Sequence, residues 1–391
     1  MQNLRSCRHS RFVISVLALG GFLALLPSGF ASPAGEPDVS TANTPRQPHS
    51  VDQELKLADQ YMSGRGVAQD AATSAHWLEK AADAGNPHAQ LAMGYLYETG
   101  IGVAKDPALA QHWYSLAAAD GLADAKTNLG MLYLWGTGVP QNISLAAQLF
   151  REAANEGSGQ GACDLGNMYY HGLGVPLDQQ EAERWYRKGA KLHNPQAEFE
   201  LGQMLFSGKD HVHDLHAAAG LLRHSAAAGS VPAMYALGLL LARNPELAKS
   251  SHETTDLLNE SARAGIWKSS EVLGVLARDG NGVPQNAEEA YFHFRVAALQ
   301  GGEEAEKKLA NDLRILSAKI GAAQTADLDS KAAAWYQHHR VVLEFISKES
   351  DNRNRFPAYA FALPADGGHA LQLLPTWNED EDLSDAHGER D

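Results

Sequence analysis

Histidine and carboxylate side chains gather in the segment 210–216, which reads Asp-His-Val-His-Asp-Leu-His. Imidazole and carboxylate groups at short spacing can bind Zn²⁺ or Cu²⁺, so His211, His213 and His216 are the metal-ligand candidates. However, Asp214 is also of the residue type that caps a helix, and 17 histidines in one chain make some clustering expected. We therefore predict a solvated loop that binds no metal, and keep the three histidines as an alternative.

Motifs of known catalytic chemistry are missing from the sequence. It contains no Gly-x-Ser-x-Gly elbow, no His-Glu-x-x-His and no Cys-x-x-Cys. Gly-x-Gly-Val occurs five times, but no Lys-Ser/Thr follows it and each copy comes after a helical pattern, so we interpret these segments as turns and not as phosphate loops. Cys163 lies in an apolar helical pattern, which favours a buried thiol over a nucleophile. We predict no catalytic residue, no cofactor and no enzymatic activity.

Small residues recur with a period of 36 residues. Glycine occupies six successive positions of one register, at Gly94, Gly130, Gly166, Gly202, Gly238 and Gly274, and alanine occupies the position on either side, at Ala58 and Ala310. Alanine occupies a second register, at Ala82, Ala118, Ala154, Ala190, Ala226, Ala262 and Ala298. A fixed period of this length indicates stacked supersecondary units, each of which buries its apolar face against its neighbours.

Each repeat has the pattern of two antiparallel helices. In the first helix Ala89, Met93 and Leu96 form an apolar stripe of helical period. Gly94 within it costs about 1 kcal/mol relative to Ala, so we predict that another helix crosses the chain at this position. The Gly-x-Gly loop then supplies the positive φ angles of a sharp reversal.

Both ends of the second helix also have a sequence signal. Residue types that cap helices precede it, at Asp70, Asp106, Asn142, Asp178, Asp214, Ser250 and Asn286. Glycines of the left-handed type follow it, at Gly85, Gly121, Gly157, Gly229, Gly265 and Gly301, with His193 as the exception.

These residues resemble the Sel1-like repeat family, a relative of the tetratricopeptide repeat. The first-helix pattern is matched by Ala125, Leu129, Gly130, Leu132, Tyr133, Gly136, Gly138 and Val139, and the second-helix pattern by Asp178, Ala182, Trp185, Tyr186, Lys188 and Ala190. The resemblance covers about 52–318 and implies an all-α, right-handed αα solenoid (superhelix) of about seven Sel1-like, TPR-like repeats. It also implies an adaptor role, in bacteria often in the envelope. Repeats five and six depart from the pattern, because Asp210, Asn244 and Glu246 replace loop glycines.

The regions outside the repeats differ in composition. Residues 1–31 combine three arginines with an apolar core of 15 residues, the pattern of a secretory signal peptide, with an uncleaved anchor as the alternative. We expect a disordered Pro-rich linker at 32–51, a C-terminal capping helix at 319–350 and an irregular or disordered acidic tail at 351–391. The net charge of −15 disfavours nucleic acid as a partner. After cleavage of the leader we expect no stable membrane span, and we cannot assign an oligomeric state.

A neighbouring face of the first helices, at i, i+4 and i+7, is the candidate partner-binding surface. Aromatic residues and carboxylates on and beside this face suit a protein or peptide partner in a concave groove, and they are Tyr95, Met131, Trp135, Asp164, Tyr170, Phe199, Glu200 and Phe206. The alternative is that these side chains pack against the next repeat.

We expect an exported, non-enzymatic scaffold or adaptor in envelope assembly or signalling, located in the periplasm or, alternatively, in the medium. Two other functions remain open. The first is β-lactam hydrolysis, to which cysteine-rich relatives in the resembled family are linked. The second is a secreted host-contact or virulence effector.

Overall fold

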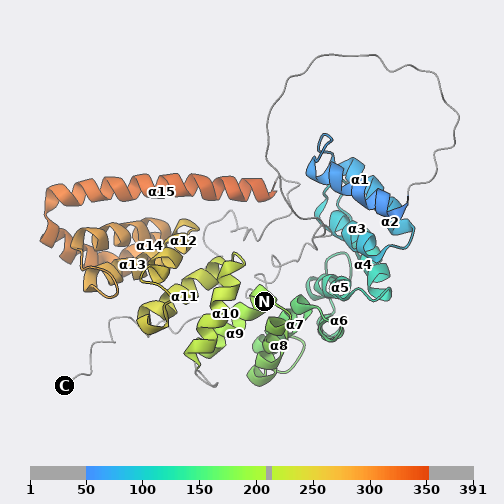
Figure 1. Ribbon diagram of the computed structural model, residues 1–391, viewed down its shortest axis with the longest axis horizontal. Helices are drawn as coiled ribbons and strands as arrows, with labels where there is room; N and C mark the ends of the chain where they lie inside the picture. Colours follow the sequence, from blue (N-terminus) through green and yellow to red (C-terminus); the bar gives the residue numbers. More distant parts are fainter. Residues whose placement is uncertain (1–49, 208–213, 352–391) are drawn as a thin grey trace, which may run out of the picture. The chain divides into compact units, whose positions relative to one another are not determined.

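The computed structural model describes residues 50–207 and 214–351, and this part of the chain consists of helices joined by short connections (Figure 1). The first helices of the repeats are α1 (Val51–Ser63), α3 (Pro87–Thr99), α5 (Ala123–Trp135), α7 (Gly159–His171), α9 (Pro195–Ser207), α11 (Val231–Arg243) and α13 (Trp267–Asp279). The second helices are α2 (Ala71–Asp83), α4 (Pro107–Ala119), α6 (Ile143–Asn155), α8 (Gln179–Lys191), α10 (Leu215–Ala227), α12 (Glu253–Arg263) and α14 (Ala287–Ile320). The 3₁₀ helix η2 (Pro245–Leu247) and the helix α15 (Ala322–Asp351) complete the described elements, which include no strand.

The predicted all-α fold of stacked helix pairs is confirmed. The two helices of one repeat pack together, as α1 and α2 or α7 and α8 do, and the second helix also packs on the first helix of the next repeat, as α8 does on α9. The described residues divide into two compact units. The N-terminal unit holds 50–125 and 136–140, and the C-terminal unit holds 126–135 and the described residues from 141 onward. The predicted leader, most of the linker and the acidic tail lie outside the described residues.

The recurrent glycine of the first helix lies where the second helix of the same repeat crosses it. A Cβ atom at Gly166 would lie 2.6 Å from Cε1 of Tyr186, and one at Gly274 would lie 2.5 Å from the ring of Phe294. The other glycines of this register face an equivalent side chain, in the pairs Gly94–Tyr114, Gly130–Phe150, Gly202–Leu222 and Gly238–Leu258. The predicted helix crossing is therefore confirmed, and a large side chain from the second helix fills the space.

The predicted turns and caps are mostly confirmed. Both glycines of each Gly-x-Gly loop have positive φ, for example 82° at Gly100 and 70° at Gly102. The side chain of Asp178 accepts hydrogen bonds from the backbone N–H groups of Gln180 and Glu181, and Asp70, Asp106, Asn142, Asp214 and Asn286 cap their helices in the same manner. His193 adopts the left-handed conformation with φ of 55°, as a helix-ending residue in this register should.

Two of these local predictions are wrong. Ser250 does not cap α12, because that helix begins only at Glu253 and His252 precedes it without a side-chain cap. Gly301 is not the left-handed residue that ends its helix. The positive φ occurs instead at Gly302 (φ 62°, ψ −143°), which lies outside the left-handed helical region and marks a kink within α14, whereas Gly301 packs closely against Trp267 and Ala305. The start of α12 is thus displaced by two residues and the positive-φ position in α14 by one.

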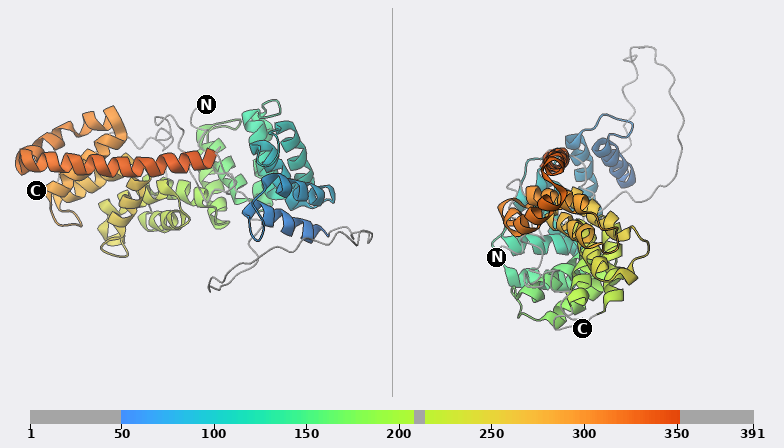
Figure 2. Two further views of the ribbon diagram at one scale, coloured as in Figure 1. Left: turned by 90° about the horizontal axis from the view of Figure 1, so that it is seen from above. Right: turned by 90° about the vertical axis from the view of Figure 1, so that its left-hand side faces the viewer.

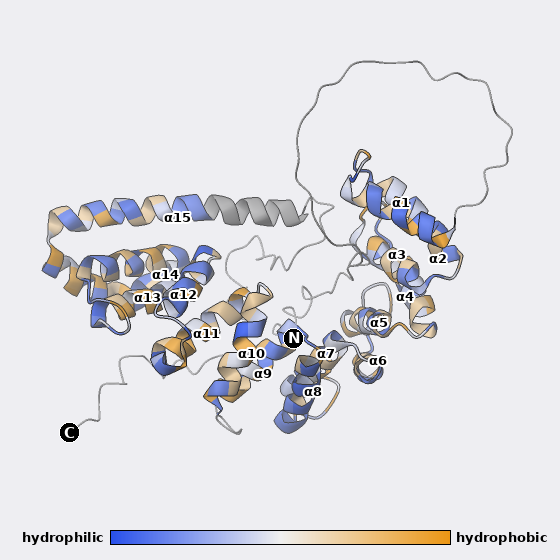
Figure 3. Cartoon of the chain, viewed as in Figure 1, coloured by the Kyte–Doolittle hydropathy of each residue, from blue (hydrophilic) through white to orange (hydrophobic). Residues whose placement is uncertain are grey.

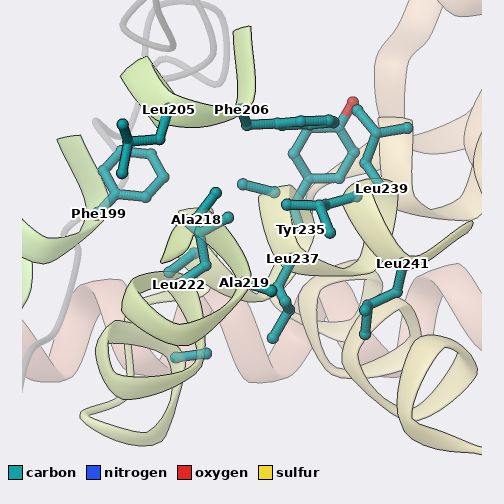
Figure 4. Close-up of a cluster of buried hydrophobic side chains, with 14 of the residues drawn as sticks. Phe199, Leu205, Phe206, Ala218, Ala219, Leu222, Tyr235, Leu237, Leu239 and Leu241 are labelled. Carbon is teal, nitrogen blue, oxygen red and sulfur yellow. The ribbon is translucent and has the colours of Figure 1, made fainter. Parts of the chain in front are cut away.

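The core of the C-terminal unit is richest around α9, α10 and α11. Figure 3 shows apolar residues along α11 and hydrophilic residues on α8. In Figure 4 the rings of Phe206 and Tyr235 lie next to each other, with Leu222 and Leu237 on neighbouring helices. Burial of each such side chain stabilises the fold by roughly 1.5–3 kcal/mol. This packing fixes how α9, α10 and α11 lie against one another.

Polar side chains join successive repeats of the C-terminal unit. Nζ of Lys188 donates to Oδ1 of Asn155 across 2.6 Å, and Nε2 of Gln300 donates to the backbone carbonyl of Ala262 across 2.7 Å. These partners are 33 and 38 residues apart, close to one repeat. The two bonds join the fourth repeat to the third and the seventh repeat to the sixth.

The last described helices extend beyond the repeat pattern. α14 continues through a kink at Gly302 and includes the eighth first-helix pattern of the sequence. α15 runs along α14 (Figure 2), and the hydroxyl of Tyr291 donates to Oδ1 of Asp329 across 2.9 Å. The same carboxylate forms an ion pair with Arg295, also at 2.9 Å. α15 is thus fixed to the final repeat by polar as well as apolar contacts.

Candidate partner-binding face of the first helices

The eight residues of the predicted binding surface differ in exposure. Met131, Asp164, Phe199 and Phe206 are buried, with at most 6% of their surface exposed. Their side chains pack within the protein, which is the alternative that the sequence left open. The remaining four are partly exposed, namely Tyr95, Trp135, Tyr170 and Glu200. Tyr95 belongs to the N-terminal unit and the others to the C-terminal unit, so their partner-binding role stays a prediction.

On α7 the polar side chains are tied together by hydrogen bonds. Nε2 of Gln160 donates to Oδ1 of Asp164 across 3.0 Å, and its Oε1 accepts from Nδ2 of Asn194 at 3.2 Å. One turn further, Oδ1 of Asn167 accepts the hydroxyl of Tyr186 at 2.7 Å, and its Nδ2 lies 3.9 Å from Sγ of Cys163. Cys163 is fully buried, as the sequence predicted. This network fixes α7 and makes Asp164 a structural residue of its interior.

Glu200 on α9 is a carboxylate in a desolvated setting. It is partly exposed but surrounded by protein, and burial raises the pKa of its carboxyl to about 7. The hydrogen bond that Nε2 of Gln196 donates to Oε1 at 2.6 Å lowers the pKa and offsets part of that effect. No ion pair within the described residues involves Glu200. Its negative charge is therefore available to a cation from outside the chain.

Tyr170 on α7 shares this environment with Glu200. Burial and, secondarily, the charge of Glu200 raise the pKa of the Tyr170 hydroxyl. The phenol therefore stays protonated at neutral pH and can donate a hydrogen bond. An aromatic ring with a polar tip beside a carboxylate is a combination that recurs in protein interfaces.

Gln203, one turn after Glu200 on α9, was not predicted as a site residue. It is 6% exposed, and within the described residues neither Oε1 nor Nε2 of its amide makes a hydrogen bond. A buried amide in this state carries a penalty of about 1–3 kcal/mol for each unmatched group. Its register position, four residues after Phe199, was the only sequence signal, because a lone glutamine in a helix has no distinctive pattern.

Tyr235 on α11 continues the same face and was also not predicted. It is buried beside Phe206 (Figure 4), and burial together with the charge of Glu271 raises the pKa of its hydroxyl. Gln203 and Tyr235 therefore line the interior below this face. We define the first-helix patch as Tyr170 on α7 and Glu200 on α9, which are partly exposed on successive first helices.

The metal candidates receive no support from the described residues. His216 is exposed on α10, whereas His211 and His213 lie outside the described residues. Within 50–207 and 214–351 no three His, Cys, Asp or Glu side chains gather closely enough to hold a metal ion. Among the helices of these ranges, none has the length and apolar composition required to cross a bilayer.

Comparison with known proteins identifies the repeat. The Sel1 repeat model matches residues 54–86, 87–122, 123–158, 159–194, 195–230 and 272–302. The matched segments omit 231–271, which contains the irregular connection between α11 and α12. No curated protein sequence matches the chain.

Several solved structures are also similar to this chain. A Sel1 repeat protein from Oxalobacter formigenes is 29% identical, with a TM-score of 0.52, over 56% of this chain and 91% of its own. The protective antigen c5321 of uropathogenic Escherichia coli, which has an SLR fold, is 22% identical over 79% and 82%, with a TM-score of 0.33. The immunity protein Pa5087 of Pseudomonas aeruginosa is 22% identical over 56% and 83%, with a TM-score of 0.29.

Proposed function

Because this chain belongs to the Sel1 repeat family, we propose that it is an exported, non-enzymatic scaffold that binds a protein segment at the first-helix patch. Sel1 repeats indicate a protein-interaction scaffold. Glu200 in the patch specifies the partner further, as a segment that carries a lysine or arginine. Its site of action is the periplasm, where it contributes to envelope assembly or signalling.

The observation that carries this proposal is the carboxylate of Glu200 beside Tyr170. A cation from a partner would satisfy a charge that burial disfavours, and such charge-assisted contacts are among the stronger ones in interfaces. The chain's net charge of −15 favours a basic partner in addition.

Export is supported by the leader pattern at residues 1–31. Fractionation of cells that express the full chain separates the possibilities, since protein in the periplasmic fraction supports the proposal. Protein that stays in the cytoplasm would contradict export. Protein found only in the medium would favour secretion instead.

The binding role is tested by crosslinking and affinity capture with the full chain, Glu200→Gln and Glu260→Gln. Glu260 is an exposed carboxylate on the second helix α12 and serves as the matched control. We expect a partner whose yield falls about tenfold with Glu200→Gln and stays unchanged with Glu260→Gln. Equal capture by all three proteins would show that the patch is not the binding site.

A chain that ends at residue 350 tests whether the acidic tail occupies the same surface. Capture that rises after this truncation means that residues 351–391 compete with the partner. Capture that stays the same restricts binding to the repeats.

A further inference from the structure

The connection between α11 and α12 departs from every other connection within a described repeat. The second helices α2, α4, α6 and α8 each have 13 residues, whereas α12 has 11. The repeat period would start α12 at Ser251, but it starts at Glu253. The preceding residues instead form η2 and bends. The first half-turn of the expected helix is therefore missing.

The missing half-turn removes a contact that other repeats make. The second loop glycine of a repeat packs on the first residue of the preceding second helix, as in the pairs Gly102–Ala71, Gly138–Pro107 and Gly174–Ile143. Ser251 is the equivalent partner of Gly282. A Cβ atom built on Gly282 meets nothing within 4 Å. Space thus opens between the sixth and seventh repeats where the protein is otherwise closely packed.

This space is a cavity of about 310 Å³. Its apolar wall consists of Leu241, Leu276 and Val283, of which the two leucines are buried in the core. A volume near the lower end of the usual range for ligand pockets suits a molecule of a few non-hydrogen atoms.

The opposite wall is rich in hydrogen-bond donors. The residues from Ser250 to Thr255 contribute the hydroxyls of two serines and two threonines, and Asn281 contributes an amide. Lys249 is the only charged residue among those that line the cavity. Lys249 thus gives the cavity wall one positive charge.

Arg223 on α10 holds this wall in place. Its guanidinium pairs with Glu253 at 2.6 Å and donates to the backbone carbonyl of Leu247, also at 2.6 Å. The pairing balances the negative charge of Glu253 next to the cavity. It also fixes both ends of the irregular connection, so that the cavity is part of the fold.

We propose that this cavity binds a small carboxylate with a short aliphatic group. Lys249 and the hydroxyls recognise the carboxylate, and the leucine and valine side chains contact the aliphatic group. Two sources have this chemistry, the C-terminal residue of a peptide and a free carboxylic acid. The site is separate from the first-helix patch, so either binding activity can fail without the other.

Calorimetric titration of the full chain with N-acetyl-Ala-Leu, its C-terminal amide and isovalerate tests the proposal. We expect saturable binding of the dipeptide acid and at least tenfold weaker binding of the amide, which lacks the charge. Binding of isovalerate alone would identify a free acid as the ligand. Absence of binding for both acids at millimolar concentration would overturn the proposal.

Three variants locate the site. Lys249→Gln should weaken binding about tenfold, whereas Lys191→Gln, at an exposed lysine of α8, should leave it unchanged. Ser251→Leu places in the cavity a side chain like that of Ile143 in repeat three, and should abolish binding. Circular dichroism checks the fold of each variant, and Lys249→Gln keeps the test valid if Ser251→Leu does not fold. Binding that is insensitive to both cavity variants would place it elsewhere.

Discussion

Adding one methyl group at the helix crossing of the fourth repeat should destabilise the protein. A Cβ atom at Gly166 would lie 2.6 and 2.7 Å from Cε1 and Cδ1 of Tyr186. The ring cannot move aside freely, because Tyr186 is 1% exposed and its hydroxyl donates to Asn167 at 2.7 Å. Gly166→Ala must therefore displace either the ring or the helix.

The expected size of this effect follows from two opposing terms. Alanine in place of glycine favours the helix by about 1 kcal/mol. Overpacking of a core costs about 1–3 kcal/mol, and a disturbed hydrogen bond of the tyrosine adds about 1 kcal/mol. The net loss of unfolding free energy for Gly166→Ala should be about 1–3 kcal/mol.

Two further glycines calibrate the measurement. Gly220→Ala on α10 places its Cβ in open space and should stabilise by about 0.5–1 kcal/mol. Gly202→Ala meets Cγ of Leu222 at 2.9 Å, and a flexible leucine yields more readily than a hydrogen-bonded ring, so this variant should fall between the others. Urea denaturation, followed by circular dichroism, ranks the three variants by their free energy of unfolding. A midpoint for Gly166→Ala as high as that for Gly220→Ala would refute the crossing argument.

Three other changes have defined outcomes. Arg223→Ala should cost about 2 kcal/mol at pH 7 in urea titrations. Burial raises the pKa of Glu253, but the hydrogen bonds and charge of Arg223, together with the backbone N–H and charge of Lys249, lower it by more, so this contribution should be present above about pH 4.5 and decline as the pH falls through the folded-state pKa. A loss that is equal at pH 3 and pH 7 would contradict it. Glu200→Gln should stabilise the protein by roughly 1–3 kcal/mol at pH 8 and by nothing at pH 4, because burial raises the pKa of Glu200 from 4.5 to about 7 and makes ionisation of the folded state unfavourable between these values. Thermal unfolding of the wild type and the variant at both pH values measures the difference. A wild-type stability that does not change with pH would contradict the prediction. Asp178→Ala should cost about 1 kcal/mol through loss of an N-cap, whereas Ser250→Ala should cost much less, and equal losses in thermal melts would show that Ser250 is a cap after all.

Most of the repeat architecture could be predicted from the sequence because its signals are local. A glycine in an apolar helical stripe, such as Gly166, indicates a crossing partner, and Tyr186 is that partner. An aspartate before a helical pattern, such as Asp178, is a cap for reasons contained within four residues. Repetition made each signal stronger than it would be alone.

The exposure of the candidate site could not be predicted in the same way. A first helix contacts the second helix of its own repeat and that of the preceding repeat, so an apolar residue such as Phe199 or Phe206 has more than one face to pack against. Their burial depends on which neighbour is closer, and no spacing within one helix encodes that. Gln203 lies on the predicted face but could not be selected as a site residue from the sequence, because its amide is unusual only in its surroundings.

The cavity could not be predicted from the sequence, because it depends on where α12 begins, and a contact distant in the sequence determines that start. Ser250 is a good capping residue, and the sequence alone places the start of α12 directly after it. The structure starts that helix at Glu253, where Arg223 from α10 fixes the carboxylate. A contact between residues 30 positions apart thus overrode the local preference.

The bonds between successive repeats have a consequence for how this protein can evolve. The bonds from Lys188 to Asn155 and from Gln300 to Ala262 each join one repeat to the next and reach no further. When one whole 36-residue repeat is inserted or deleted, the same contacts between successive repeats can form again on either side. The length of such a protein can therefore change without a new set of contacts. The boundary between the sixth and seventh repeats at Gly282 is the exception, because it depends on the irregular connection before α12. A lineage that gains or loses repeats can therefore do so freely elsewhere, but must keep the sixth and seventh repeats together to retain the cavity.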